Sequence, residues 1–318
     1  MKELNLDDIL ESTSDLTTEK KVWYVAIIGR PNAGKSTFIN ALIGEKVSIT
    51  SNVPQTTRKK VLAIYNDDDS QIVFFDTPWI HFEEKMFNKE INNQAISTLR
   101  DSEVVLYFID SSRKTWEEER YIENILENVC VPILKIYTKR DLRAQIDIPE
   151  DTNPSPSGDF PWKGKKSIFE ISSVTKTGFT DLLDRIKEIL PTSPLLFPED
   201  FYTKQDMFFR VSEIIREKVF TNTKEEIPHS IFISVEEIET EQRKDWQELL
   251  KVVAYINAES DSQKYILIWS KWSLIAKMWK ESRIELEQVF WKKVFLALRV
   301  KVKKNWRKDA GVVKGILN

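Results

Sequence analysis

The segment from residue 22 to residue 43 holds the feature that most limits how this chain can fold. An apolar run, Val22 to Ile28, is followed by GRPNAGKS at residues 29–36 and then by the helix-favouring stretch TFINALI. The octapeptide fits the pattern G-x-x-x-x-G-K-[ST]. In that pattern loop amides and a helix N-terminus face phosphate oxygens, the lysine neutralises them, and the hydroxyl binds Mg²⁺. Because the motif needs a strand before it and a helix after it, it predicts an α/β domain that binds a nucleotide.

Further strands and helices are predicted downstream, in alternation. Apolar segments that end in polar residues predict strands within residues 71–79, 102–110, 131–141 and 166–173. Helical stretches are expected at 86–100, 116–128 and 179–190, whereas 51–60 is predicted to be a polar loop. Alternating strands and helices favour a mostly parallel sheet, with the ligand at the carboxyl ends of the strands.

The strand predicted within 131–141 ends in Thr138-Lys139-Arg140-Asp141, which identifies the base. A carboxylate at Asp141 can accept hydrogen bonds from the N1–H and 2-amino groups of guanine, and adenine lacks that pair of donors. A base that leaves a buried carboxylate unpaired is rejected by several kcal/mol, of order 10⁴-fold. The expected nucleotides are therefore GTP and GDP, bound with Mg²⁺.

The chain resembles the Era family of bacterial GTPases from about residue 21 to residue 318. The resemblance is carried by GRPNAGKST, SITSN, PQTTR, DTP, FPEDF, SEIIREK and VKVKKNW. It implies a P-loop GTPase domain at 21–190, a short linker at 191–200, and a smaller α+β KH domain of the bacterial type II at 201–318. Residues 1–20 are expected to be a disordered tail.

The resemblance also implies roles for individual residues, and Mg²⁺ is expected at Ser36, Thr57 and Asp76. Two residues depart mildly from the family pattern: Thr138 replaces the usual Asn, which is expected to loosen the loop that Asn would hold, and Ser173 replaces Ala. The residues expected to bind nucleotide are Gly29, Asn32, Ala33, Gly34, Lys35, Ser36, Thr37, Asp76, Thr138, Lys139, Asp141, Ser172 and Ser173.

The expected catalytic residues are Lys35, Thr57, Asp76, Trp79 and Ile80. Ile80 occupies the position at which Ras-like enzymes carry the glutamine that orients water, so hydrolysis is expected to be slow. Backbone groups, the metal or a monovalent cation such as K⁺ would then position the water. Asn32 is the expected ligand of that cation, and the alternative is that it only shapes the loop.

The C-terminal part of the chain is strongly basic although the net charge of the protein is −3. Residues 291–308 contain eight basic residues and no acid, and these alternate with apolar residues as on one face of a strand. This pattern indicates either a nucleic-acid surface or a solvated face. The residues expected to contact RNA are Trp269, Ser270, Lys271, Trp272, Lys277, Lys301, Lys303 and Lys304.

The partner implied by the resemblance is the 3′ end of small-subunit ribosomal RNA, bound during assembly of the small ribosomal subunit. A monomer in the cytoplasm is expected, with peripheral association at the inner face of the cell membrane. The alternatives are a non-hydrolysing RNA-binding factor that senses nucleotide, a degenerate Era paralogue with impaired RNA binding, and another translation GTPase.

Tryptophan stands where the family has glycine. The chain has 10 tryptophans and 8 glycines, although average usage of roughly 7% predicts about twenty glycines. Residues 266–268 are predicted to end a strand, and Trp269 and Trp272 flank the turn that follows. Trp306 matches a tryptophan of the family. The tryptophans at family glycine positions are Trp23, Trp79, Trp269, Trp272, Trp279 and Trp291.

Three explanations compete for these substitutions. A degenerate paralogue would lose glycines to many residue types, and stacking of Trp269 and Trp272 on bases would not explain Trp23, Trp79 or Trp291. A gene in which UGA encodes glycine, read with a code in which UGA encodes tryptophan, accounts for all six positions. That explanation predicts UGA codons at all six positions and a UGG codon at the seventh aligned tryptophan, the one shared with the family.

Other residues exclude some classes of site. Cys130 is the single cysteine, so the chain has no internal disulfide, and a buried core thiol is expected there. Two histidines make a histidine metal site or a Ser/His/Asp triad improbable. The polar, acidic N-terminus lacks the features of a signal peptide, which favours the cytosol.

Overall fold

The computed structural model describes residues 19–49, 61–77, 95–114, 117–142, 167–223, 227–242, 248–269 and 273–317. The described residues divide into two compact units: the second comprises residues 48–49 and those from Gln205 onward, and the first comprises the others up to Lys204. Several predicted site residues lie outside the described residues, namely Thr57, Trp79, Ile80, Ser270, Lys271, Trp272 and the side chain of Trp269.

The first unit is built on a seven-stranded sheet with the main order β2-β3-β1-β4-β5-β6. The pairs β3-β1, β1-β4, β4-β5 and β5-β6 are parallel, and β2 is antiparallel to β3. The strands are β1 (Lys20–Gly29), β2 (Val61–Asn66), β3 (Ser70–Asp76), β4 (Val104–Asp110), β5 (Ile133–Thr138), β6 (Ile168–Glu170) and β7 (Thr192–Ser193). The predicted mostly parallel α/β sheet is confirmed, and β2 is a strand that the sequence analysis did not identify.

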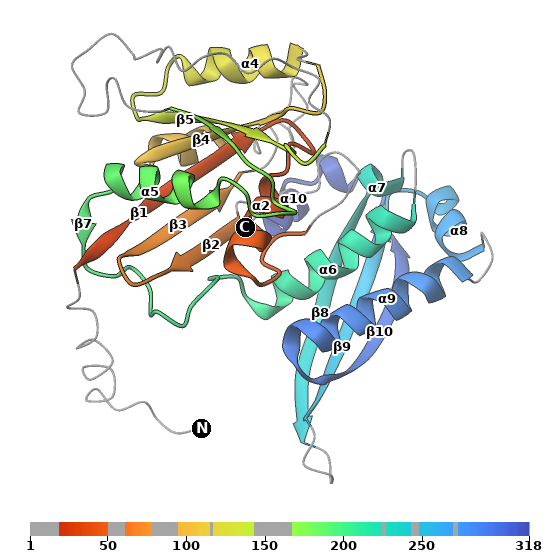
Figure 1. Cartoon of the computed structure of the whole chain (residues 1–318). Helices are drawn as coiled ribbons and strands as arrows, with labels where there is room; N and C mark the ends of the chain where they lie inside the picture. Colours follow the sequence, from red (N-terminus) through yellow and green to blue (C-terminus); the bar gives the residue numbers. More distant parts are fainter. Residues whose placement is uncertain are drawn as a thin grey trace. The chain divides into compact units, whose positions relative to one another are not determined.

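Helices cover both faces of this sheet (Figure 1). One face packs against α2 (Lys35–Ile43) and α5 (Phe179–Ile189), where Phe38 contacts Phe74, Phe108 and Phe179 with ring centroids 4.9–6.0 Å apart. The other face packs against α4 (Glu117–Leu126) and the helical residues 95–100. Because β1 and β4 are covered on both faces, their residues are apolar almost throughout.

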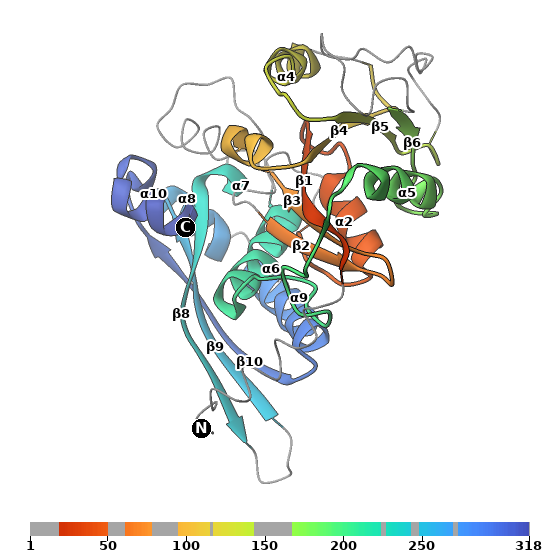
Figure 2. The same ribbon diagram turned by 90° about the vertical axis from the view of Figure 1, so that its left-hand side faces the viewer.

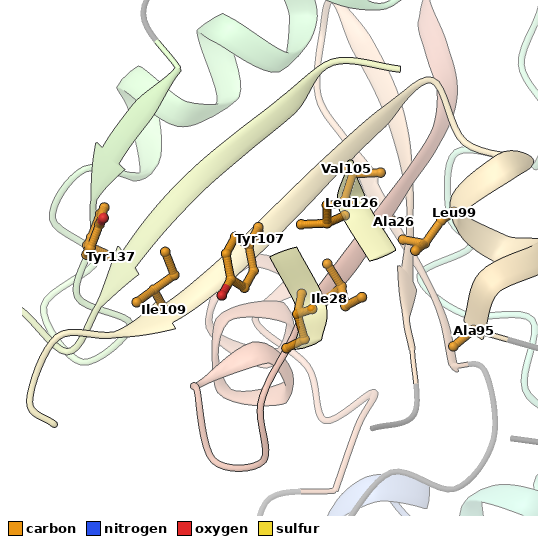
Figure 3. Close-up of a cluster of buried hydrophobic side chains, with 10 residues drawn as sticks. Ala26, Ile28, Ala95, Leu99, Val105, Tyr107, Ile109, Leu126 and Tyr137 are labelled. Carbon is orange, nitrogen blue, oxygen red and sulfur yellow. The ribbon is translucent and has the colours of Figure 1, made fainter. Parts of the chain in front are cut away.

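Figure 3 shows the core on the α4 face. Side chains of β1 and β4, such as Ile28 and Tyr107, interdigitate with Leu126 of α4 and Leu99 of the preceding helical segment. All of these are less than 9% exposed. This packing holds the carboxyl ends of β1 and β4 at fixed positions, and the functional loops leave the sheet there.

The segment predicted as a linker, 191–200, is bound to the first unit. Gln71 accepts hydrogen bonds from the amides of Leu196 and Phe197 and donates to the Phe197 carbonyl at 2.7 Å. Residues 192–193 form β7, which pairs with β1. Gln71 thus satisfies part of the backbone of this extended segment, and Asn66 donates to the Glu199 carbonyl within it.

The second unit is a three-stranded sheet with the order β10-β9-β8, in which β9 is parallel to β10 and antiparallel to β8. Figure 2 shows α6 and α9 on one face of this sheet. The elements are α6 (Met207–Asn222), α7 (Ile227–Ser230), β8 (Ile231–Gln242), β9 (Glu248–Ala258), α8 (Asp261–Trp269), α9 (Ser273–Phe290), β10 (Lys293–Val302), η2 (Trp306–Lys308) and α10 (Ala310–Leu317). The α+β class predicted for the second half is confirmed.

Two local predictions are wrong. Residues 266–268 lie in helix α8 and do not end a strand; only Leu267 of the apolar run is fully buried, and Ile266 is solvent-exposed. A short run of Ile and Leu is compatible with either element. Cys130 is exposed in the connection between α4 and β5, where the half-buried Val129 and Val131 face the core and the thiol does not.

Among the described helices, none combines the length and apolar character needed to cross a membrane.

Candidate nucleotide-binding site

The phosphate loop connects β1 to α2 and has the backbone of an anion cradle. A Cβ atom at Gly29 would lie 2.5 Å from the Phe108 carbonyl oxygen, so the close approach of β1 to β4 requires glycine. Gly34 has φ 91° and Asn32 has φ 62°, both in the left-handed region. Helix α2 begins directly afterwards, at Lys35. The N-terminal amides of α2 and the helix dipole therefore favour an anion at this loop.

Lys35 is held inside the loop. Its side chain is 8% exposed, and Nζ donates hydrogen bonds to the carbonyl oxygens of Gly29 at 2.7 Å and Arg30 at 3.0 Å. Burial lowers the pKa of Lys35 to about 8, and the negative charge of Asp76 acts in the opposite direction. A buried ammonium gains more from a phosphate partner than an exposed one, because it has already lost its water.

Ser36 and Asp76 form the candidate magnesium site. The Ser36 hydroxyl donates to Asp76 Oδ2 at 2.8 Å, and Asp76 is fully buried at the end of β3. A hydroxyl and a carboxylate are hard oxygen donors, which suit Mg²⁺ together with phosphate oxygens. The two residues thus fit the metal, and the third predicted ligand, Thr57, lies outside the described residues.

The residues predicted to bind the base gather at the ends of β5 and β6. Asp141 follows β5, and its Oδ1 accepts a hydrogen bond of 2.6 Å from the Ser172 hydroxyl. The Ser172 oxygen also accepts from the Thr175 amide, which fixes the turn that contains Ser173. Residues separated by 31 positions in the sequence are therefore brought together, as the sequence predicted for a guanine subsite.

Thr138 is tied to the phosphate loop, contrary to the looser hold expected of it. Its hydroxyl lies 2.8 Å from the Ala33 carbonyl oxygen and 3.2 Å from that of Ile109. The shorter threonine side chain can reach the phosphate loop because β5 and this loop are adjacent. A Cβ atom built at Gly34 of the loop would lie 3.7 Å from the Thr138 hydroxyl oxygen.

Sequence reasoning missed a set of buried charges beside this site. Asp110, at the end of β4, lies 2.7 Å from Lys139 Nζ, and Arg30 of the phosphate loop lies 3.0 Å from Glu119 of α4. The position of Asp110 at the carboxyl end of a buried strand was the one available indication. Its sequence context, FID, contains no recognised motif.

The described residues expected to contact RNA all lie in the second unit. The predicted alternation of β10 is confirmed: Val294 and Leu296 are buried, whereas Lys293, Arg299 and Lys301 are exposed. Trp269 is the last residue of α8, and residues 270–272 lie outside the described part of the chain.

Some of these cations already have acidic neighbours. Lys301 Nζ lies 2.8 Å from Glu236 and 3.3 Å from the centroid of the Tyr255 ring, while Lys304 lies 3.6 Å from Asp261. Lys277 lies 3.7 Å from Glu281 on the same helix. Lys303 is exposed next to them. To bind a phosphate, each of these paired lysines would have to break its ion pair with the acidic residue or contact both groups at once.

Among the unusual tryptophans whose backbone the structure describes, Trp291 occupies a conformation that favours glycine. Trp291 directly follows α9, has φ 54° and is 88% exposed. The residue after a helix C-terminus commonly adopts this left-handed conformation, and it is usually glycine. Trp23 and Trp279 have no such requirement: Trp23 packs against Tyr24 in β1, and Trp279 donates from Nε1 to the Leu296 carbonyl.

Comparison with known proteins gives a consistent result. Residues 24–139 match the model of the 50S ribosome-binding GTPase family. GTPase Era of Treponema denticola is 41% identical over 293 residues, covering 92% of this chain and 98% of the relative. GTPase Era of Geobacter metallireducens is 36% identical over 291 residues, covering 92% and 95%.

Two solved structures share the whole architecture. An Era variant from Aquifex aeolicus bound to GDP and aluminium fluoride has a TM-score of 0.80 at 30% identity, over 93% of this chain and 98% of that one. Era in complex with MgGDPNP and nucleotides 1506–1542 of 16S ribosomal RNA has a TM-score of 0.81 at 30% identity and the same coverage. With this identity over almost its whole length and a phosphate loop assembled on this fold, the chain belongs to the Era family of GTPases.

Proposed function

We propose that this GTPase binds the 3′ end of small-subunit ribosomal RNA, that its nucleotide state controls this binding, and that it assists maturation of the small subunit. In this proposal residues 21–190 bind and hydrolyse GTP, 191–200 connect the domains, and 201–318 form the RNA-binding KH domain. The proposal is supported by a nucleotide site and a basic strand in one chain, and by the related Era that was solved with 16S ribosomal RNA.

The nucleotide part follows from the geometry at the carboxyl ends of the strands. Lys35 and the amides at the start of α2 neutralise and orient the phosphates, and Asp141 selects guanine through its carboxylate. Ser36 and Asp76 would hold Mg²⁺, which neutralises charge on the β- and γ-phosphates when it is bound. Catalysis is then mainly positioning and electrostatic stabilisation, and no covalent intermediate with the protein is needed.

The direct test is RNA binding in two nucleotide states. The chain is titrated with a labelled RNA matching the 3′ end of small-subunit ribosomal RNA, in the presence of either GDP or a non-hydrolysable GTP analogue. Tighter binding in one state supports the proposal, whereas equal affinity in both states removes the nucleotide control. GTP turnover measured with purified small subunits distinguishes the enzyme from a factor that only senses nucleotide.

Three finer properties belong to the same proposal. Asn32, with its left-handed backbone in the phosphate loop, is the proposed ligand of a monovalent cation, so turnover in K⁺ should exceed turnover in Na⁺. A monomeric state and peripheral membrane association are carried over from the family resemblance. Analytical ultracentrifugation tests the first of these, and sedimentation with anionic vesicles tests the second.

A further inference from the structure

The end of β4 carries a buried carboxylate that belongs neither to the phosphate motif nor to the base motif. Asp110 is 1% exposed. Its Oδ1 accepts hydrogen bonds from the Ser112 hydroxyl at 2.6 Å and the Ser112 amide at 3.0 Å, which fix the direction of the carboxylate. Burial alone would raise the pKa of Asp110, but the hydrogen bonds from Lys139 and Ser112 lower it below its usual value. The group is therefore an anion at neutral pH.

The second oxygen of Asp110 faces the cations of two functional loops. Oδ2 lies 2.7 Å from Nζ of Lys139 in the base-binding loop, and 4.0 Å from a guanidinium nitrogen of Arg30 in the phosphate loop. The exposed Arg113, three residues further along the chain, lies 3.6 Å from the same oxygen. The Lys139 backbone has φ 61°, a conformation that costs energy for any residue with a Cβ. Lys139 is thus held at both ends, by a strained backbone and by an ion pair.

We propose that Asp110 is a positioning residue for the guanine nucleotide, and that it holds the Lys139 side chain in place before the nucleotide arrives. The inference rests on the proposed nucleotide site and adds a residue to it. A lysine stem has several rotatable bonds, so ordering it during binding would cost entropy. An ion pair that orders it in advance reduces that cost.

The chain offers a matched control in Glu119. Both carboxylates neutralise the buried Arg30, at 3.0 Å from Glu119 and 4.0 Å from Asp110. Lys139 forms its ion pair with Asp110, at 2.7 Å. Glu119→Gln therefore disturbs the buried charge of Arg30 and leaves the contact with Lys139 intact. A purely structural role for Asp110 predicts the same behaviour from both variants.

The experiment measures binding of fluorescent mant-GDP, and of GTP by competition, to the full chain with Mg²⁺ at a temperature at which all variants are folded. Asp110→Asn keeps the Oδ1 acceptor and replaces Oδ2 with a group that cannot accept from Lys139. It should raise the Kd for both nucleotides about tenfold, because the Lys139 side chain must then be ordered during binding. Glu119→Gln should stay within about twofold of the parent, because the ion pair that it removes is the one with Arg30 and not the one with Lys139. In a Lys139→Met background, Asp110→Asn should cause no further change.

Three results would overturn the inference while leaving the nucleotide site itself intact. These are an unchanged Kd in Asp110→Asn, an equal loss in Glu119→Gln, or a full tenfold loss in the Lys139→Met background. If Asp110→Asn does not fold, Ser112→Ala provides a second test, because it retains every charge and removes the hydroxyl that fixes the Asp110 carboxylate. The Kd of this variant for nucleotide should rise about threefold. An unchanged Kd would overturn the inference. A parent chain that does not bind mant-GDP would instead remove the proposed function and this inference with it.

Discussion

Replacing Trp291 by glycine should stabilise the second unit. The residue follows the last turn of α9 at φ 54° and is 88% exposed, so its indole adds little buried surface. A residue with a Cβ pays roughly 1–2 kcal/mol in this left-handed conformation. Glycine avoids that cost but loses more freedom on folding, which offsets roughly 0.5–1 kcal/mol. The net gain in the free energy of unfolding should be about 0.5–1 kcal/mol.

Urea unfolding of the full chain, followed by far-UV circular dichroism, measures this gain as a higher midpoint at an unchanged slope. Trp291→Ala is the matched control, because it removes the indole and keeps the Cβ that makes the conformation costly. We expect the alanine variant to remain close to the parent. A glycine variant no more stable than the alanine variant would refute the reasoning, since the backbone would then have no preference for glycine at this position.

The remaining predictions concern the two functional surfaces. Because burial lowers the pKa of Lys35 to about 8, the affinity for GDP should fall from pH 7 to pH 9. Calorimetry near pH 8.5 should show proton uptake on binding. An absence of uptake would contradict the lowered pKa of this buried amine. The same shift should make the nucleotide-free protein more stable as the pH rises from 8 to 10.5, because Lys35 holds its proton more tightly in the unfolded chain than in the folded one. Replacing Trp269 and Trp272 together by glycine should tighten RNA binding on the order of tenfold, because a KH loop clamps the nucleic-acid backbone and glycine lets that backbone approach closely. Weaker binding would instead favour stacking of the two indoles on RNA bases. Lys303→Ala should reduce the slope of log affinity against log salt by about 0.7, and Lys301→Ala by less, because Glu236 already neutralises Lys301; equal slopes would contradict this ranking.

Much of the first unit could be predicted because its loops combine a fixed pattern with a fixed place in the fold. Gly29 is required by the close approach of β1 to β4, and Gly34 by its left-handed backbone. Both glycines are fixed positions of the phosphate-loop motif, so the sequence reveals them. The strands were predictable because burial on both faces leaves continuous apolar runs, as in β4. The carboxyl ends of those strands then brought Asp76 and Asp141 to one edge.

The remaining features depend on contacts between distant residues, which no local pattern reveals. Among the described strands, β2 pairs along its length with β3 alone, and its first residues adjoin a polar stretch, so its pattern was weak. The docking of 191–200 depends on Gln71, more than a hundred residues away. Asp110 resembles any acid at the end of a strand until Lys139 is placed beside it. Residues 266–268 of helix α8 were mistaken for the end of a strand because three consecutive apolar residues fit both the helical and the strand periodicity.

The recognition of guanine by Asp141 is the central claim, and an Asp141→Asn variant tests it most directly. The amide keeps the shape but cannot accept two hydrogen bonds from guanine, whereas its N–H can donate to the C2 carbonyl of xanthine. Competition against mant-GDP should show a loss of GDP affinity of at least about a hundredfold and a gain in affinity for xanthosine diphosphate. Unchanged GDP affinity, with no gain for xanthosine diphosphate, would contradict the assignment of this site.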